Sequence, residues 1–462
     1  MTEARAPRAV AHGIEDWRRE AEVHAAAGRL DAAEALLGRI LAAAPDDPPL
    51  LHRAALVSHQ RKRPAEAAER LERAVALAPE EATYRRDLCE IYRLHGRLDA
   101  ALAHGRRAIE LAPDDAGAHY NLGVLHYDRM EIEDALRHDR RALALDPTLV
   151  AAHFELAEAL LLSGRFAEGW QEYEYRFDLP NVPRLLPDDR PAPLWDGRPM
   201  PDGMLLLIGD QGFGDTIQFC RYIRDVAKLC PNLIVAASAE MRPIILQQPG
   251  VSRCSDQWQE MPAFDAYCPL SGLPRLFRTD LDSIPAPVPY LRADPAKARE
   301  WRRRLDALVP RGYRRIAVAW AGRPAHGNDF NRSMRLARLA ALAREPETAL
   351  LSLQKGPAQA EIGGYFGPAP LINLGAEIAD FTDTMAILAG VDRLVAVDTA
   401  VAHLAGAMGR PVSILLPYAP DWRWLIGRSD SPWYPTATLC RQAMPGDWDS
   451  AVTAMLRTLG RR

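Results

Sequence analysis

The sequence contains few cysteines, and their spacing follows no known binding pattern. Six cysteines are scattered over 462 residues without a Cys-x-x-Cys pair. This spacing argues against a disulfide framework and against a zinc site, and it favours reduced, buried thiols. We therefore expect a cytoplasmic protein.

Long apolar runs and an excess of positive charge are also missing. No stretch of about 18 uncharged apolar residues occurs, so we expect no membrane span. The first twenty residues lack the apolar centre of a signal peptide. The formal net charge of −4 provides no positive field that would attract nucleic acid. The length is sufficient for two or three soluble domains.

The first third of the sequence contains a repeat with a period of 34 residues. Prolines recur at this spacing, as do two columns of small residues. These positions are Pro45, Pro79, Pro113 and Pro147; Ala33, Ala67, Ala101 and Ala135; and Ala55, Cys89, Gly123 and Ala157. The period predicts packed helix pairs with small residues where the helices touch. It resembles the tetratricopeptide repeat, with four repeats and a fifth, capping unit in residues 14–178.

The resemblance to tetratricopeptide repeats implies a curved stack whose concave face binds an extended protein or peptide segment. By the geometry of that family, the groove is lined by Arg86, Arg93, Tyr120, Asn121 and Tyr127. The alternative for each of these residues is a solvated helix face.

Residues 179–202 form a proline-rich linker or wrapping arm, because seven prolines between positions 180 and 201 interrupt regular structure. Within it, Leu194 and Trp195 are expected to attach the arm to a neighbouring domain. Beyond residue 202, strand and helix patterns alternate, which predicts parallel sheets. We interpret residues 203–310 and 311–462 as two Rossmann-like domains, with ligands beyond the carboxyl ends of their strands. The expected strands are 204–209, 233–238, 264–270, 314–322, 349–354, 371–375, 393–398 and 411–417.

The stretch "GDQGFGDT" (209–216) is a glycine-rich loop between an expected strand and an expected helix. It matches neither the dinucleotide fingerprint nor the P-loop, which disfavours a nicotinamide or flavin cofactor. Gly212 and Gly214 allow a ligand to approach the backbone. Asp215, followed by Thr216 at the helix start, is either a helix cap or a functional carboxylate.

A second unusual loop, "VDTAVAHLAGAMGRP" (397–411), follows a later strand. The two loops together resemble those of the heptosyltransferase-like group of bacterial glycosyltransferases, which have the GT-B fold. With "EGWQEYEYRF", "NDFNRS", "SLQKGP" and "PDWRW", the chain is similar to bacterial tetratricopeptide proteins with a C-terminal glycosyltransferase domain. Some proteins of that class modify flagellin or other proteins.

The resemblance implies an α-solenoid followed by a GT-B fold, with a nucleotide-sugar donor. Carried over by position, Asp215 is the general base and Arg332 the cation on the donor phosphates. Asp398, Thr399 and His403 form the donor-site signature. Two departures matter. Arg332 replaces a lysine of the group, and the loop 417–424 replaces a shorter one, which leaves the preference for base or sugar open.

Further candidates carry weaker signals. Lys355 either reaches a phosphate or is solvated, and His326 and Asn328 are expected at the mouth of the cleft. Trp424, with Trp422, either stacks on a base or sugar or anchors its loop. No residue cluster has metal-ligand spacing, so no metal and no cofactor besides the substrate is expected.

The sequence therefore favours an enzyme that transfers a sugar to an acceptor hydroxyl, with inversion, and whose repeats recruit a protein acceptor. The alternative is a binding adaptor with an inactive glycosyltransferase-like domain.

Overall fold

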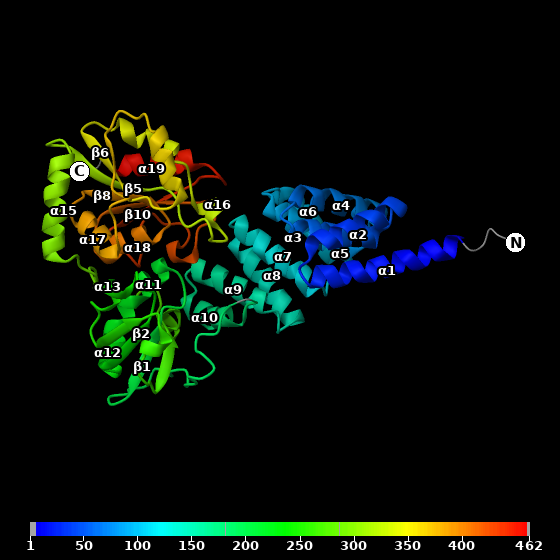
Figure 1. Cartoon of the computed structure of the whole chain (residues 1–462), viewed down its shortest axis with the longest axis horizontal. Coiled ribbons are helices and arrows are strands. Elements are labelled where there is room, and N and C mark those ends of the chain that lie inside the picture. Colours follow the sequence, from blue (N-terminus) through cyan, green and yellow to red (C-terminus); the bar gives the residue numbers. More distant parts are fainter. Residues whose placement is uncertain (1–5, 181, 286, 460–462) are drawn as a thin grey trace. The chain divides into compact units, whose positions relative to one another are not determined.

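The structure is a computed structural model that describes residues 6–180, 182–285 and 287–459. The chain divides into two compact units, Met1–Ala159 and Leu160–Arg462, and Figure 1 shows their elements. No helix in the described ranges combines the length and apolar character that a membrane crossing needs.

The first unit is a helical solenoid built from consecutive helices that contact one another in pairs. Its helices are α1 (Ala6–Ala26), α2 (Leu30–Ala43), α3 (Pro48–Gln60), α4 (Pro64–Leu77), α5 (Ala82–Leu94), α6 (Leu98–Leu111), α7 (Ala116–Asp128), α8 (Ile132–Leu145) and α9 (Val150–Leu162), which crosses the unit boundary. Both columns of small residues are buried, and their alanines and Cys89 are 0% exposed. The predicted tetratricopeptide-like packing is therefore confirmed for this region.

The turns between paired helices repeat one backbone conformation every 34 residues. Gly28, Gly96 and Gly164 have φ of 71°, 69° and 80°, in the left-handed region that favours glycine. Lys62 and Met130 occupy the same place in the other repeats, with φ of 58° and 60°. The repeat therefore imposes this conformation even where the residue is not glycine.

The second unit contains two sheets whose strand pairs are all parallel. The strands are β1 (Met204–Ile208), β2 (Asn232–Ala236), β3 (Val251–Ser255), β4 (Ala266–Pro269), β5 (Arg314–Ala319), β6 (Thr348–Ser352), β7 (Leu371–Asn373), β8 (Arg393–Val397), β9 (Val412–Leu416) and β10 (Ala437–Arg441). The first sheet has the order β3-β2-β1-β4, and the second β10-β9-β8-β5-β6-β7. Strands β3 and β10 were not predicted, because "VSRCS" and "ATLCR" mix polar and apolar residues.

Helices and short 3₁₀ turns connect these strands. The α-helices are α10 (Phe166–Glu172), α11 (Phe213–Phe219), α12 (Ile223–Leu229), α13 (Arg242–Ile245), α14 (Leu273–Leu276), α15 (Pro295–Leu308), α16 (Asp329–Arg332), α17 (Phe381–Ala389), α18 (Ala400–Ala407) and α19 (Trp448–Leu459). The 3₁₀ helices are η1 (Tyr173–Asp178), η2 (Cys220–Tyr222), η3 (Trp258–Glu260), η4 (Leu270–Gly272), η5 (Leu336–Ala340), η6 (Leu342–Arg344), η7 (Pro357–Gly364) and η8 (Trp422–Trp424).

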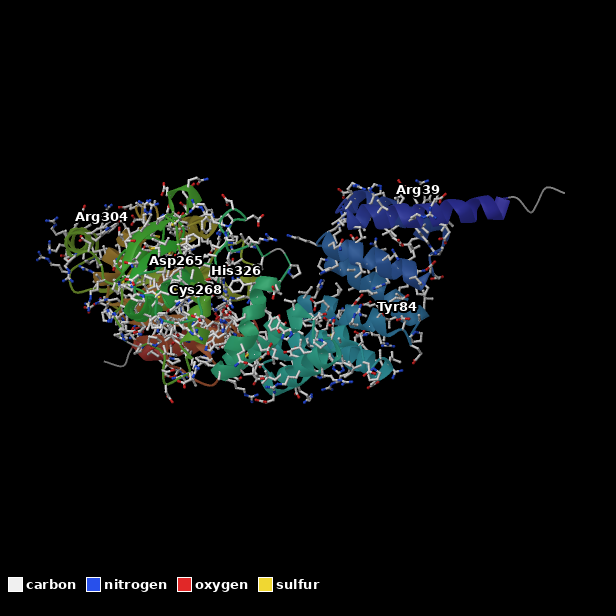
Figure 2. The ribbon with its side chains drawn as sticks, turned by 90° about the horizontal axis from the view of Figure 1, so that it is seen from below. Arg39, Tyr84, Asp265, Cys268, Arg304 and His326 are labelled. Atoms are coloured by element: carbon white, nitrogen blue, oxygen red, sulfur yellow. The ribbon has the colours of Figure 1, made fainter. Side chains whose placement is uncertain are left out.

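Buried apolar side chains fill the interior of the second unit. In the second sheet, Val318 and Val395 pack with Met455 of α19 in one cluster. Cys268 of β4 lies inside the unit, whereas Arg304 of α15 reaches solvent (Figure 2). All six cysteines are buried and free.

The segment that was expected to cap the repeats is divided between the two units, and its later part belongs to the second. The boundary lies after Ala159, and α10 and η1 follow it. Trp170 of α10 explains why α10 belongs to the second unit. Its indole N–H donates to the carbonyl of Thr279 at 2.9 Å, and its ring packs edge-on against Trp422 with the ring centroids 5.2 Å apart. The expected boundary at residue 178 is therefore about one helical hairpin too late.

The proline-rich arm attaches to the first sheet. Leu194 forms a parallel bridge with Tyr267 of β4, and the N–H of Trp195 donates to the Tyr267 carbonyl at 2.8 Å. The Trp195 side chain is buried as expected, but that of Leu194 is 46% exposed. The backbone groups on either side of Leu194, the N–H of Trp195 and the carbonyl of Pro193, therefore hold the arm, and the Leu194 side chain does not.

Candidate functional site

Each sheet has one point where the strand order reverses, and the candidate residues gather at both. Parallel sheets bind ligands at such points, beyond the carboxyl ends of the strands. In the first sheet the reversal lies between β1 and β4, and in the second between β5 and β8. The loop after β1 leads to Asp215, the loop after β5 leads to Arg332, and the loop after β8 begins with Asp398.

The glycine-rich loop, residues 209–214, ends in a hydrogen-bonded helix start. The backbone N–H of Gly212 donates to Oδ2 of Asp215 at 2.9 Å. The buried Thr216 hydroxyl donates to the carbonyl of Gly212 at 3.2 Å. Gly212 is the N-cap residue of α11, and Asp215, at the third helical position and not at the cap itself, reaches back to the N–H of Gly212.

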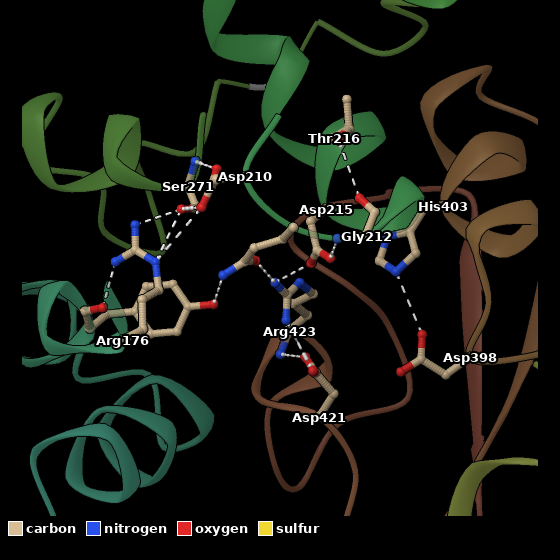
Figure 3. A network of polar contacts seen from close by, with 12 residues as sticks. Arg176, Asp210, Gly212, Asp215, Thr216, Ser271, Asp398, His403, Asp421 and Arg423 are labelled. Carbon is tan, nitrogen blue, oxygen red and sulfur yellow. Dashed lines mark hydrogen bonds and ion pairs between the residues drawn. The ribbon is translucent and has the colours of Figure 1, made fainter. Parts of the chain in front are cut away.

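Helices α11 and α18 meet where Gly214 faces His403. A Cβ atom on Gly214 would lie only 2.9 Å from Cδ2 of His403. Only glycine permits this approach without a shift of the imidazole. The first turns of α11 and α18, which follow the loops after β1 and β8, therefore come into direct contact, and Figure 3 shows His403 beside the start of α11.

His403 joins Asp398 to the interior of the second unit. Its Nε2 lies 3.5 Å from Oδ1 of Asp398, and its Nδ1 lies 2.8 Å from the hydroxyl of Tyr434. Burial by itself would raise the pKa of Asp398, but the hydrogen bond and charge of His403 lower it below its usual value. The charge of Arg332 acts in the same direction. Asp398 is therefore a buried, ionised carboxylate.

The structure adds Arg423 of η8, a residue that sequence reasoning missed. Its guanidinium is 8% exposed and donates to both oxygens of Asp421 at 2.9 Å, and to Oδ1 of Asp215 at 2.5 Å. It also lies over the ring of Trp422, 4.2 Å from the centroid. Burial by itself would lower the pKa of Arg423, but Asp421 and Asp215 raise it well above its usual value. The signal in the sequence that could have indicated Arg423 was its place between two tryptophans in "PDWRW".

Arg332 lies beside the backbone of the loop after β5. A Cβ on Gly322 would lie 3.0 Å from a terminal nitrogen of Arg332 and 2.6 Å from Oδ1 of Asp329. The side chain of Arg332 is 20% exposed. Burial lowers the pKa of His326, and the charge of Arg332 lowers it further. Nδ1 of His326 accepts from the N–H of Asn328 at 3.1 Å, which leaves the Nε2 proton as the donor of a neutral ring.

The remaining predicted residues of the second unit have local partners. The Nζ of Lys355 donates to the carbonyl of Ile378 at 2.5 Å. The hydroxyl of Thr399, at the start of α18, donates to the carbonyl of Val397 at 3.3 Å. Trp424 is 0% exposed and lies 5.2 Å from the ring of His403, and its indole N–H has no hydrogen-bond partner among the described residues. This burial agrees with an anchoring role, and stacking on a base or sugar stays a prediction.

The predicted peptide-groove residues lie on α5 and α7. Their polar side chains form hydrogen bonds and ion pairs within and between these two helices. Arg93 forms ion pairs with Glu90 at 2.8 Å and with Asp128 at 2.7 Å. The amide of Asn121 donates to the carbonyl of Arg86 at 3.2 Å. These contacts hold the helices together and leave the side chains only partly open to a peptide.

Charge and burial distinguish the other groove residues. Arg86 pairs with Asp87 at 2.9 Å and with Asp115 at 3.2 Å. Burial raises the pKa of the Tyr120 phenol, and nearby Glu155 raises it further. Tyr127 is half-buried.

A cluster that the sequence did not predict brings three metal-ligating side chains together in α7 and α8. One ligand atom each of His126, Glu131 and Asp134 lie within 4.8 Å of one another. Nδ1 of His126 is 2.6 Å from Oε2 of Glu131, and Arg129 and Arg137 pair with the two carboxylates. The spacing along the chain matches no common metal motif, and the arginines already balance both negative charges.

These features define a protein with a tetratricopeptide-like solenoid followed by a unit of parallel sheets. A family model for the tetratricopeptide repeat matches residues 90–129. A curated relative, Protein FlbA of Caulobacter vibrioides, is 26% identical over 322 residues, which cover 63% of this chain. The match spans 52% of FlbA, so the chain corresponds to about half the length of this relative.

Two solved structures are similar to part of this chain. A thermophilic tetratricopeptide protein of Thermus thermophilus is 27% identical, with a TM-score of 0.33, and the match covers 36% of this chain and 90% of that one. The pilF protein of Pseudomonas aeruginosa is 17% identical, with a TM-score of 0.33, and the match covers 36% of this chain and 75% of that one.

Proposed function

We propose that the second unit is a glycosyltransferase of the GT-B type. It would move a sugar from a nucleotide-sugar donor to a hydroxyl of a protein acceptor, with inversion, while the repeats recruit that protein. Flagellin is one candidate acceptor, because some proteins of the class that the sequence resembles modify flagellin. The observation that supports the proposal most is the contact of Gly214 with His403, because it brings together the helices that follow two loops at strand-order reversals.

In this proposal the donor phosphates lie at the N-terminus of α18. Helix N-termini bind phosphate through free N–H groups and the helix dipole. Arg332, whose charge lowers the pKa of Asp398, would neutralise the departing phosphate. The Nε2 proton of His326 is a second donor near Arg332.

Asp215 would accept the proton of the acceptor hydroxyl. The acceptor oxygen then bonds to the anomeric carbon as the bond to the phosphate breaks, and the nucleoside diphosphate leaves with the bonding electrons. Arg423 occupies Oδ1 of Asp215, so that oxygen can accept the proton only once this contact loosens. Arg423 keeps Asp421 as a second partner, so a shift toward the leaving phosphate would free Asp215 without leaving the guanidinium unpaired.

A panel of nucleotide sugars tests the proposal through the melting temperature of the full chain. A ligand at one hundred times its dissociation constant stabilises the folded state by about 2.7 kcal/mol. At least one sugar nucleotide should raise the melting temperature of wild type, and Arg332→Ala should reduce the shift. Arg335→Ala is the matched control, because Arg335 is 82% exposed and pairs only at the surface with Glu361. Equal shifts in both variants would contradict the role of Arg332.

The second candidate function is a protein-binding adaptor with an inactive α/β unit. The tetratricopeptide match supports it, because such repeats bind proteins. If no sugar nucleotide stabilises the chain while an acceptor protein binds it, the adaptor is favoured over the enzyme.

A further inference from the structure

The short helix η1 contacts the glycine-rich loop at two consecutive residues. The side-chain amide of Gln211 donates to the hydroxyl of Tyr173 at 2.9 Å. The other end of the same amide, its oxygen, accepts from Arg423 at 3.4 Å. Arg423 in turn holds Asp215. A chain of four side chains therefore joins η1 to the carboxylate of Asp215 (Figure 3).

A second branch holds the preceding loop residue. The Arg176 guanidinium is buried, and its Nε donates to the hydroxyl of Ser271 at 3.1 Å. The backbone N–H of Ser271 donates to Oδ1 of Asp210 at 3.1 Å, and the Ser271 hydroxyl donates to Oδ2. Asp210 also lies 3.9 Å from Nε of Arg176. Tyr173 and Arg176 of η1 thus both restrain the strand-to-helix loop, and both side chains are buried.

The hydroxyl and the ring of Tyr173 make different contacts, and the hydroxyl is the group that accepts from Gln211. Its ring packs edge-on against Trp170 and Trp422 at 6.0 Å, and it stacks on the guanidinium of Arg176 at 4.4 Å. A phenylalanine would keep all these ring contacts and lose the bond to Gln211. The substitution therefore separates the role of the hydroxyl from the role of the ring.

We propose that Tyr173 is a positioning residue for Asp215, acting through Gln211 and Arg423. Residues 166–178 are then a wall of the candidate site and not a cap of the repeats. The catalytic consequence rests on the proposed function, whereas the effect on the loop does not.

Hydrogen exchange in the full chain tests the effect on the loop directly. Loss of one hydrogen bond should raise the exchange rate of amides 209–216 roughly 2- to 12-fold in Tyr173→Phe. Tyr365→Phe is the control, because it removes a comparable bond, to the carbonyl of Ala369 at 2.8 Å, in another part of the unit. Unchanged exchange of the loop in Tyr173→Phe, or an equal rise in Tyr365→Phe, overturns the proposal whether or not the chain transfers sugar.

A double-mutant cycle then tests the route through Gln211. With an active donor, Tyr173→Phe should lower kcat several-fold and leave KM for the donor unchanged. Tyr173→Phe combined with Gln211→Ala should be no slower than Gln211→Ala alone, because both changes remove the same bond. Additive losses of kcat would overturn the route through Gln211. If wild type has no transfer activity, the proposed function fails, and hydrogen exchange still decides the role of Tyr173.

Discussion

Replacing Asp215 by asparagine separates its role as a base from its role in holding the loop. The carboxylate accepts from the N–H of Gly212 and from Arg423, and it is 25% exposed. Gly212 and Arg423 donate to different oxygens, Oδ2 and Oδ1, and in an asparagine one of these positions becomes an amide NH₂ that cannot accept. The other donor then loses its partner, which costs about 1–3 kcal/mol for a partly buried charged contact.

This stability cost predicts a small change in melting temperature. Unfolding entropy is about 2.1 cal/mol/K per residue, and the second unit has about 300 residues, so the expected decrease is roughly 2–5 °C. At 25 °C the protein remains folded, because typical stabilities are about 5–15 kcal/mol. Loss of a general base lowers turnover by roughly 10²–10⁴. The expected fall in turnover therefore does not come from unfolding.

Asp421→Asn is the matched control for this experiment. Asp421 pairs with the same guanidinium and is 34% exposed, so its loss should cost similar stability. It should reduce turnover less than about tenfold, because it accepts no proton in the proposed reaction. Turnover is measured with saturating donor and acceptor, and donor affinity by calorimetry. Equal losses of turnover in the two variants, or a nearly active Asp215→Asn, would refute the assignment of Asp215 as the base.

Three further predictions concern stability and reactivity. Gly123→Ala should lower the urea concentration at which the repeats unfold, because the added Cβ would overlap Oδ1 of buried Asp139. Gly38→Ala, whose added Cβ meets nothing within 4 Å, should instead stabilise α2 by up to about 1 kcal/mol. The reverse order of urea midpoints would contradict this packing. The lowered pKa of Asp398 stabilises the fold at pH values above its unfolded pKa of about 3.9, and this contribution is lost as pH falls below about 4. His403→Gln weakens the contact and should reduce the dependence of the unfolding free energy on pH in that range. An unchanged pH dependence would argue against the pair. The six buried thiols should not react with Ellman's reagent until the chain unfolds, and rapid labelling of native protein would refute their burial.

The repeat architecture could be predicted from the sequence because it depends on local spacing. A period of 34 residues fixes which small residues meet, and the columns containing Ala33 and Ala55 are buried as expected. The strands that are continuously apolar, such as β1 and β8, were predicted for the same reason, since a strand buried on both faces has an apolar run. Strands β3 and β10 have mixed composition, and only their neighbours in the sheet define them.

The candidate site was predictable only in its separate loops. Chain order places Asp215 after one strand and His403 after another, but sequence spacing does not tell whether Gly214 touches His403. Arg423 was missed because a guanidinium acquires its role from the carboxylates that surround it, and Asp215 lies 208 positions away. Contacts over such distances follow from the packing of whole elements.

The sequence by itself determined the period of the helices, the apolar strands and the positions of the glycines, since each depends on residues close along the chain. The tertiary structure alone decided that α10 and η1 belong to the parallel-sheet unit, because Trp170 finds its partners at Thr279 and Trp422. It also decided that Asp215 is ion-paired and not free, because burial brings Arg423 to it from the other sheet.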